Sequence, residues 1–171
     1  MADSILVRAA VAEDATAIAA IYAPHVLNGV TSFEVVVPDV AEILRRREAV
    51  LELGLPYLVA EIDGEVAGYA YASQFRPRAA YRFTVENSVY VAKRFQRRGV
   101  ARHLMRELIE QSARAGMRQM IAVIAEPSGS TASVALHRSL GFEEVGVLCE
   151  VGEKFGRAVD VLIMQRALIS T

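Results

Sequence analysis

The spacing of hydrophobic residues changes several times along the chain, and each change predicts a new element of secondary structure. Hydrophobic residues three or four positions apart predict helices at residues 12–22, between Asp39 and Gly54, at Gly99–Ala115 and at Thr131–Leu140. Alternating or unbroken hydrophobic stretches predict strands at Ser4–Val7, Tyr57–Ile62, Glu65–Ser73, Phe83–Val91, Met120–Ala125, Val145–Val151 and Ala158–Met164. Residues Asn28–Phe33 have neither pattern and are predicted to form a loop.

Residues at the ends of these elements agree with the assignment. Asp39 follows Pro38 and is a typical residue to cap a helix, and Asp63-Gly64 favours a type I′ turn between two strands. The resulting order is β-α-α-β-β-β-α-β-α-β-β, without a change in composition that would mark a second domain. The sequence therefore predicts a single domain over residues 1–171, of the α/β or α+β class, with a mixed central sheet.

Composition narrows the class of protein further. Of the 171 residues 23% are charged, and only 5 are Pro and 11 Gly, which argues against a disordered chain. No hydrophobic run approaches the roughly 18 residues that a membrane span requires, and the N-terminus lacks the hydrophobic stretch of a secretory signal. Cys149 is the single cysteine, which excludes an intramolecular disulfide and a multi-cysteine metal site. We expect a cytoplasmic protein that binds no metal and no membrane, with Cys149 buried as a small hydrophobic residue.

The net charge of −1 conceals an uneven distribution of charge along the chain. Residues 76–106 hold nine basic side chains and one acid, Glu86, whereas the rest of the chain is acidic. This segment is suited to meet an anion, although a solvated basic surface would have the same composition. Because domains that bind nucleic acid are usually basic as a whole, we expect no nucleic acid as a partner.

The most informative segment is Q-R-R-G-V-A at residues 96–101, between a predicted strand and a predicted helix. The first turn of a helix presents unpaired backbone N–H groups and the positive end of the helix dipole. Gly99 would let an oxyanion approach this backbone closely, and Arg97, Arg98 and Arg102 would surround it with positive charge. The segment is neither a P-loop nor G-x-G-x-x-G, and by itself it is also compatible with an ordinary turn that contains a Gly.

Q-R-R-G-V-A resembles the Q/R-x-x-G-x-G/A signature of the GNAT superfamily of N-acetyltransferases, and the order of the elements is similar to that of the family. Other segments are similar to one branch, the phosphinothricin and methionine sulfoximine N-acetyltransferases: T-S-F-E (31–34), F-R-P-R (75–78), T-V-E-N-S-V-Y-V (84–91), A-S-V-A-L-H-R-S-L-G-F (132–142) and V-G-E-K-F-G-R-A-V-D-V (151–161). The resemblance implies a GNAT fold, with a mixed, mostly antiparallel sheet of about seven strands and about four helices. It also implies acetyl-CoA as co-substrate, the α-amine of a small amino acid as acceptor, and a homodimer with the tail from Val145 onward as its interface.

Acetyl transfer to an amine requires a base, because a protonated amine cannot attack. Glu86 is the only acid in the basic segment, and the resemblance makes it the general base; a salt bridge with neighbouring arginines is its alternative role. His137 stands where many members of the family have a tyrosine that protonates the departing thiolate, and an imidazole can donate a proton near neutral pH. A hydrogen bond to a nearby carbonyl is the alternative role of His137, and the sequence leaves both open. Direct transfer, without an acetyl-enzyme, is expected.

The resemblance also implies how acetyl-CoA is held. A backbone N–H near Val89 would stabilise the oxyanion, and backbone groups of Tyr90 and Val91 would pair with the pantetheine arm. The pyrophosphate would lie against Gln96, Arg97, Arg98, Gly99, Val100, Ala101 and Arg102. Ser130 occupies the position of an Asn that often contacts the cofactor in this family.

Residues around the catalytic strand are expected to bind the acceptor. Arginine can bind carboxylate and phosphinyl oxygens through two parallel hydrogen bonds, and three arginines lie in the loop before this strand. The expected set comprises Phe33, Glu34, Arg76, Pro77, Arg78, Tyr81, Arg82, Glu86, Asn87 and Ser88.

Two other functions compete with this interpretation. A peptide or ribosomal-protein N-terminal acetyltransferase would share the cofactor loop but would need an open groove, which the F-R-P-R loop would block if it folded over the pocket. A non-catalytic module that binds acyl-CoA or nucleic acid is the other alternative, and the joint presence of Glu86 and His137 argues against it.

Overall fold

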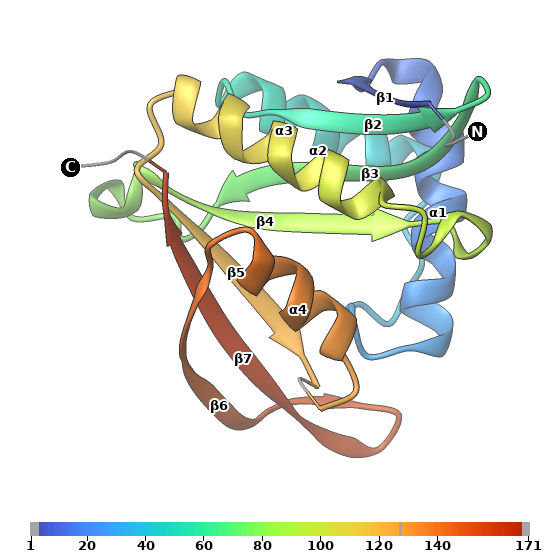
Figure 1. Cartoon of the computed structure of the whole chain (residues 1–171). Helices are drawn as coiled ribbons and strands as arrows, with labels where there is room; N and C mark the ends of the chain where they lie inside the picture. Colours follow the sequence, from blue (N-terminus) through green and yellow to red (C-terminus); the bar gives the residue numbers. More distant parts are fainter. Residues whose placement is uncertain (1–3, 127, 169–171) are drawn as a thin grey trace.

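The computed structural model describes residues 4–126 and 128–168, which form a seven-stranded sheet between two layers of helices (Figure 1). The order across the sheet is β1-β2-β3-β4-β5-β7-β6. The strands are β1 (Ile5–Ala9), β2 (Tyr57–Ile62), β3 (Glu65–Gln74), β4 (Thr84–Val91), β5 (Gln119–Ala125), β6 (Glu143–Lys154) and β7 (Arg157–Ala167). The helices are α1 (Ala15–Asn28), α2 (Val40–Glu52), α3 (Val100–Arg114) and α4 (Thr131–Ser139), with single 3-10 turns at Ala12–Asp14, Ala79–Tyr81 and Lys93–Phe95.

Helices cover both faces of the sheet, with α3 and α4 in front of it and α1 and α2 behind it in the view of Figure 1. Residues on both faces of β2 are therefore buried, and its central residues Leu58, Val59 and Ala60 have no exposed surface. From α3, the hydrophobic stripe that contains Leu104 and Leu108 packs into the same core. Within the described ranges, no helix has the length and hydrophobicity needed to cross a membrane.

Local sequence signals place most element boundaries. The Asp39 carboxylate accepts a hydrogen bond from the backbone N–H of Glu42 at 2.7 Å, as expected for a helix cap. Asp63 and Gly64 have φ angles of 52° and 78°, which a type I′ turn requires. Helix α1 extends beyond residue 22, continuing through Pro24 to Asn28, so the first residue of the predicted loop is helical.

Strands β4 and β5 part from each other within the sheet. They are the only parallel pair among the described strands, and their register extends only from Thr84–Gln119 to Glu86–Ile121. Both strands continue beyond that point, β4 to Val91 and β5 to Ala125. The sheet therefore contains a fork that begins immediately after Glu86.

The C-terminal hairpin of β6 and β7 corrects one prediction. Cys149 lies on β6 and is exposed, not buried. Strand β6 forms the edge of the sheet, and its register with β7 is interrupted between Leu148 and Gly152. Because only β7 flanks this irregular strand, all its side chains from Glu143 to Val151 are exposed, the hydrophobic ones included.

Candidate active site

A cavity of about 860 Å³ passes through the sheet at the fork between β4 and β5. On the side of α3 and α4 its lining includes Gly129, Ser130, Ser133 and His137. On the side of α1 the lining includes Tyr22, His25, Ser32, Phe33 and Glu34. Residues 86–90 of β4 and 122–125 of β5 line its waist. The cavity thus connects two faces that a fully paired sheet would separate.

The alternation of β4 determines which groups face the fork. Backbone hydrogen bonds from Phe75 N–H to the Thr84 carbonyl and from Ala92 N–H to the Ala67 carbonyl show that even-numbered residues of β4 bond to β3. The backbone groups of Val89 and Val91 consequently point toward the fork, where β5 no longer pairs with them. Those of Tyr90 point toward β3, and its ring points toward α1.

Glu86 lies at the junction of the fork, on the face that also carries Ser88 and Tyr90. Burial raises the pKa of its carboxyl group above the ordinary value of 4.5, and the positive charge of Arg76 acts in the opposite direction. Removal from water disfavours the charged carboxylate, so this group holds a proton more tightly than an exposed Glu does. Glu86 can therefore accept a proton inside the cavity.

Glu34 lies on the α1 side of the cavity, and two side chains bind its carboxylate. Arg46 of α2 binds its carboxylate through both terminal nitrogens, at 2.6 and 3.0 Å. The Tyr22 hydroxyl donates to Glu34 at 2.8 Å and also contacts the Ser32 hydroxyl. The Arg46 guanidinium keeps the pKa of Glu34 below its ordinary value, so this carboxylate stays charged and fixed in position.

A cluster of tyrosine rings adjoins the α1 side of the cavity, where Tyr22 and Tyr90 contribute to the lining. Tyr57 stacks on Tyr71 with ring centroids 4.9 Å apart, and Tyr69 stacks on Tyr90 at 5.3 Å. Tyr22 contacts the Tyr90 ring edge-on at 5.0 Å. Five of the six tyrosines in the chain therefore form one cluster beside the cavity. Burial raises the pKa of Tyr22 to about 12, so its hydroxyl remains protonated and able to donate.

The β6–β7 hairpin packs against the α1–α2 loop on the same side of the cavity. Gly152 leaves room for the Phe33 ring, because a Cβ atom at Gly152 would lie only 2.3 Å from it. Lys154, with 4% of its surface exposed, donates to the Ser32 carbonyl at 2.6 Å and lies 3.5 Å from the His25 carbonyl. These contacts join the loop that carries Phe33 and Glu34 to a hairpin more than a hundred residues later in the chain.

On the opposite side, His137 of α4 and Asn87 of β4 bond to each other. His137 Nε2 lies 3.0 Å from Asn87 Oδ1, and Asn87 Nδ2 donates to the Ile121 carbonyl at 3.1 Å. His137 Nδ1 lies 2.8 Å from the Ser133 carbonyl. Ser130 lines the cavity, but its hydroxyl bonds back to the Ala125 carbonyl at 2.8 Å. Asn87 therefore points away from the acceptor side on which sequence analysis placed it.

The predicted anion loop has the expected backbone. Gly99 precedes the first residue of α3 with a φ of 88°, and no side chain caps the helix there. Arg97 also has a positive φ, 61°. The side chains of Arg97, Arg98 and Arg102 are exposed around the first turn of α3, while Gln96 lines the cavity. The start of α3 therefore has the components of an anion site: free backbone N–H groups, a glycine in the left-handed conformation and three arginines.

The arginine-containing loop before β4 differs from the prediction in where its side chains lie. Arg76, Arg78 and Arg82 are exposed, as are Pro77 and Tyr81, and neither described cavity is lined by any of them. Arg82 packs over the Phe83 ring and donates to the Ala79 carbonyl. Among the three arginines, Arg76 is the one whose charge affects the pKa of Glu86.

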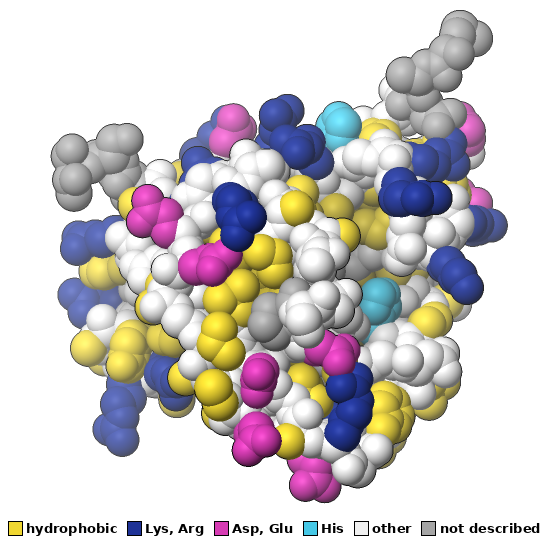
Figure 2. All heavy atoms as spheres, turned by 60° about the horizontal axis from the view of Figure 1, so that its bottom comes forward, with side chains coloured by type: hydrophobic (Ala, Val, Ile, Leu, Met, Phe, Trp, Pro, Cys, Tyr) yellow, Lys and Arg dark blue, Asp and Glu magenta, His cyan; other side chains and the backbone are white. Residues whose placement is uncertain are grey.

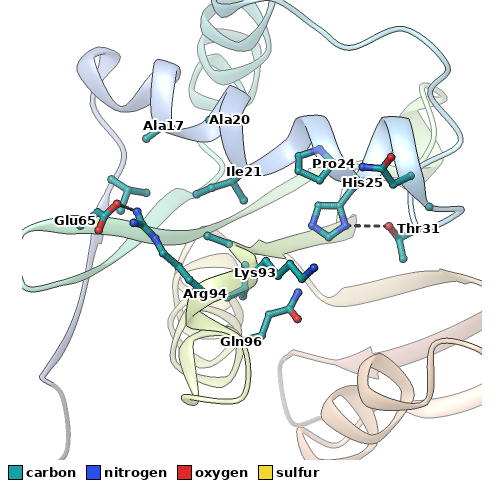
Figure 3. A pocket seen from close by; sticks show the side chains of 15 residues that line it. Ala17, Ala20, Ile21, Pro24, His25, Thr31, Glu65, Lys93, Arg94 and Gln96 are labelled. Carbon is teal, nitrogen blue, oxygen red and sulfur yellow. Dashed lines mark hydrogen bonds and ion pairs between the residues drawn. The ribbon is translucent and has the colours of Figure 1, made fainter.

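A second cavity, of about 570 Å³, lies between α1 and the segment that follows β4 (Figure 3). His25, Thr31 and Gln96 line both cavities, so the second continues from the first. Figure 3 shows His25 bonded to Thr31, and Arg94 paired with Glu65 at the far end. Most of its remaining lining is apolar, with Ala17, Ala20, Ile21 and Pro24 contributed by α1.

Comparison with known proteins identifies the family. The model of the acetyltransferase (GNAT) domain matches residues 7–163. The chain belongs to the GNAT acetyltransferase family. It is 52% identical over 156 residues to the phosphinothricin N-acetyltransferase of Alcaligenes faecalis, covering 91% of this chain and 79% of that one. It is 39% identical over 169 residues to the L-methionine sulfoximine/L-methionine sulfone acetyltransferase of Pseudomonas paraeruginosa, covering 98% and 97% of the two chains.

The fold agrees with that of a solved GNAT enzyme. An acetyltransferase of Salmonella typhimurium, crystallised with its cofactor acetyl-CoA, superposes with a TM-score of 0.94 at 38% identity, covering 98% of this chain and 96% of that one. The predicted GNAT fold, with its mixed and mostly antiparallel sheet, is therefore confirmed. Several residues around the cavity of this GNAT domain were absent from the predicted set: Tyr22, His25, Ser32, Arg46, Tyr71 and Lys154. No sequence motif predicts that these residues lie near the cavity, because they come from separate elements and come together only in the folded chain.

Proposed function

We propose that this chain transfers the acetyl group of acetyl-CoA to the α-amine of a small amino acid of the phosphinothricin or methionine sulfoximine type. The observation that carries the proposal is the cavity through the fork, which has Glu86 at its waist and different chemistry at its two ends. The substrates named for the relatives, which share 52% and 39% of their aligned residues with this chain, support the choice of acceptor.

The residues on the α3 and α4 side fit acetyl-CoA. Val89 and Val91 present backbone groups that have no strand partner on that side among the described residues, so they can pair with an extended amide-containing arm. The loop that ends at Gly99 and the first turn of α3 present N–H groups and arginines to a pyrophosphate. Acetyl-CoA, when bound, supplies an acetyl thioester whose carbonyl carbon is open to attack by an amine. The N–H of Val89 would then face the oxyanion that forms, and collapse of that intermediate would break the C–S bond and release CoA as its thiolate.

Glu86 would accept the proton of the acceptor amine, directly or through a water. Burial raises its pKa and so makes the carboxylate a stronger base, while the charge of Arg76 acts in the opposite direction. The alternation of β4 places Glu86 and Ser88 on the α1 face, where the acceptor would enter. His137 Nε2 lies against Asn87 Oδ1 and Nδ1 lies against the Ser133 carbonyl, so the contacts of the ring within the protein do not favour its role as a proton donor to the thiolate.

The α1 side would hold the acceptor. Glu34, fixed by Arg46 and Tyr22, offers a permanent negative charge for the ammonium form of the incoming amine. Phe33 and the tyrosine cluster bound the space available to the side chain. Arg76 supplies positive charge near Glu86 and is our proposed partner for the anionic group of the acceptor.

We also propose that two copies of the chain associate through β6. This edge strand exposes Val145, Val147, Leu148 and Val151, and a long hydrophobic edge is an unfavourable surface for a monomer. Figure 2, which brings this side of the molecule forward, shows hydrophobic side chains exposed between charged ones. The mass of the particle in analytical ultracentrifugation tests the proposal, with Val147→Asp expected to shift the equilibrium toward the 18.6 kDa monomer.

One observation favours a second candidate, a peptide N-terminal acetyltransferase. The second cavity continues from the acceptor side along α1, and it would give room to residues that follow the acetylated one. The loop at residues 75–78, which was expected to block such a path, lines neither cavity.

Thiol release from acetyl-CoA distinguishes the candidates. The panel contains L-phosphinothricin, L-methionine sulfoximine, L-methionine sulfone, ordinary amino acids and a ribosomal-type N-terminal peptide. We expect rapid release with the first three compounds and none with the peptide. Release with the peptide alone would establish the second candidate, and no release with any compound would overturn both.

A further inference from the structure

The bonds between His137, Asn87 and Ile121 lie where the ladder between β4 and β5 ends. Glu86 and Ile121 form the last register pair, and Asn87 is the first residue of β4 beyond it. The Asn87 side chain, in a residue that is 7% exposed, donates from Nδ2 to the carbonyl of Ile121. The amide thus crosses from β4 to β5 at the apex of the fork, where it can set the angle at which the strands part.

The acceptor at Ile121 fixes the orientation of the amide and, through it, the proton on His137. A carbonyl oxygen only accepts, so Nδ2 must face Ile121 and Oδ1 must face His137. His137 Nε2 therefore carries the hydrogen that Oδ1 accepts at 3.0 Å. On the other side of the ring Nδ1 is also next to an acceptor, the Ser133 carbonyl at 2.8 Å.

Both ring nitrogens of His137 therefore lie against oxygen atoms of the protein, and the single N–H of a neutral imidazole is the one that Asn87 Oδ1 accepts. The residue is 3% exposed, and the Phe142 ring lies edge-on to the imidazole with the centroids 5.0 Å apart. A proton given up from Nε2 would leave Asn87 Oδ1 facing a lone pair, and the bond that orients the amide would be lost. The imidazole ring therefore holds the Asn87 amide in place, and transfer of its proton to a leaving group would break the hydrogen bond between the two side chains.

We propose that His137 and Asn87 form a positioning pair that sets the opening of the β4–β5 fork, with His137 acting on the reaction through Asn87 and not as a proton donor to the thiolate. The pair fixes Asn87, two residues before the Val89 backbone that faces the fork, and it anchors β5 through Ile121. This inference rests on the proposed acetyl transfer, but its effect on acetyl-CoA binding is independent of the acceptor.

Four variants and a control test the pair. His137→Leu and Asn87→Ala each remove the bond, and the double variant removes both side chains. In His137→Gln an amide N–H can still donate to Asn87, but the side chain has no proton to transfer near neutral pH. Ser139→Ala, on the same helix, removes a side-chain bond to the Leu136 carbonyl and serves as the control. The measurements are acetyl-CoA affinity by calorimetry without acceptor, kcat across pH, and the Tm of each variant.

We expect His137→Leu and Asn87→Ala to weaken acetyl-CoA binding by about 10-fold and to lower kcat on the order of 100-fold, since a small displacement of reacting groups has effects of that size. The double variant should match the single ones within about 3-fold, because the two residues act as one unit. His137→Gln should stay within about 3-fold of the unaltered chain, with an unchanged pH profile. Ser139→Ala should have no effect on binding or kcat.

Other outcomes would overturn the proposal in distinguishable ways. If His137→Gln is as slow as His137→Leu and the basic limb of the pH profile disappears, His137 is a proton donor. If His137→Leu lowers the Tm and leaves affinity and kcat unchanged, the pair only stabilises the fold. The unaltered chain could transfer acetyl to no acceptor while the variants still weaken acetyl-CoA binding as expected. In that case the proposed function is wrong, but the proposed role of the His137–Asn87 pair still holds.

Discussion

On the side of α3 and α4, the cavity is lined by residues of α4 and of the segment before it, next to the loop that begins α3. On the side of α1 it is bounded by side chains from α1, the α1–α2 loop and β4, and the β6–β7 hairpin packs against that loop. The first side uses mostly backbone groups, at Val89, Val91 and the start of α3. The second side consists of charged and aromatic side chains. Arg46 binds Glu34, and Lys154 binds the Ser32 carbonyl, so both hold the α1–α2 loop in place.

This difference between the two sides determines which residues can change without loss of function. A backbone site binds the parts that every molecule of acetyl-CoA has in common and tolerates many side chains. A site made of side chains can change its acceptor through single substitutions without altering the fold. We therefore expect changes on one side of the sheet to affect one substrate and to leave the other unaffected.

The largest effect is expected where the two sides meet. Glu86→Gln should lower kcat on the order of 100- to 10,000-fold at neutral pH, because the amide cannot accept a proton, while both KM values change little. In the unaltered chain the rate should fall as pH decreases through the raised pKa of Glu86, and this acid limb should be absent from the variant. Glu143→Gln, on the exposed edge strand, is the control. A variant at Glu86 that retains the rate and the limb would show that another group is the base.

A substitution confined to the acceptor side tests the separation directly. Arg46→Ala releases Glu34, and the KM of the amino acid should rise on the order of 10-fold through loss of a charge-assisted bidentate pair. The KM of acetyl-CoA should remain unchanged in steady-state kinetics. Arg45→Ala removes the neighbouring arginine, which pairs with Glu42, and should change neither value. A parallel rise in both KM values after Arg46→Ala would contradict the separation of the two sides.

The matching change on the cofactor side is Gly99→Ala. A φ of 88° costs a residue with a side chain about 1–2 kcal/mol, which corresponds to a roughly 5- to 30-fold rise in the KM of acetyl-CoA. The amino-acid KM should stay as it is. Gly54 also has a positive φ and open space around it, so Gly54→Ala provides a control for backbone strain far from the loop. Equal effects of the two substitutions on acetyl-CoA would mean that the loop conformation does not matter for binding.

The smallest expected effect on the pH profile comes from Arg76, whose removal should also raise the KM of the amino acid if Arg76 binds the anionic group of the acceptor. Its charge lowers the pKa of Glu86, so Arg76→Ala should move the acid limb of the pH profile upward, and only slightly because the side chain is exposed and screened by salt. Arg78→Ala in the same loop should leave the limb in place. A limb that moves equally in both variants would mean that the overall charge of the loop, and not Arg76, acts on Glu86.

The cofactor side and the sheet could be predicted from the sequence because their signals are local. Asp39, Asp63-Gly64 and Gly99 each require a particular backbone within a few residues, and the structure has that backbone. Helix α1 continues beyond its predicted end at residue 22, because the loss of one hydrogen bond at Pro24 is compatible with a helix that buries Val26.

The acceptor side could not be predicted in the same way. Charge density in the sequence marked the loop that holds Arg76, but density does not give the direction of a side chain, and that loop faces solvent. Arg46 and Lys154 have no motif around them, and their partners are 12 and 122 residues away in the chain. Cys149 was assigned to the interior by residue type alone, which cannot tell an edge strand from a central one.

The tyrosine cluster makes the acceptor side visible without any added label. The chain contains no tryptophan, and five of its six tyrosines stack on one another beside the cavity. Tyr22 and Tyr90 of this cluster line the proposed acceptor side of the cavity. We therefore expect binding of an amino acid there to change the intrinsic tyrosine fluorescence of the chain, so that occupancy can be followed without an added label.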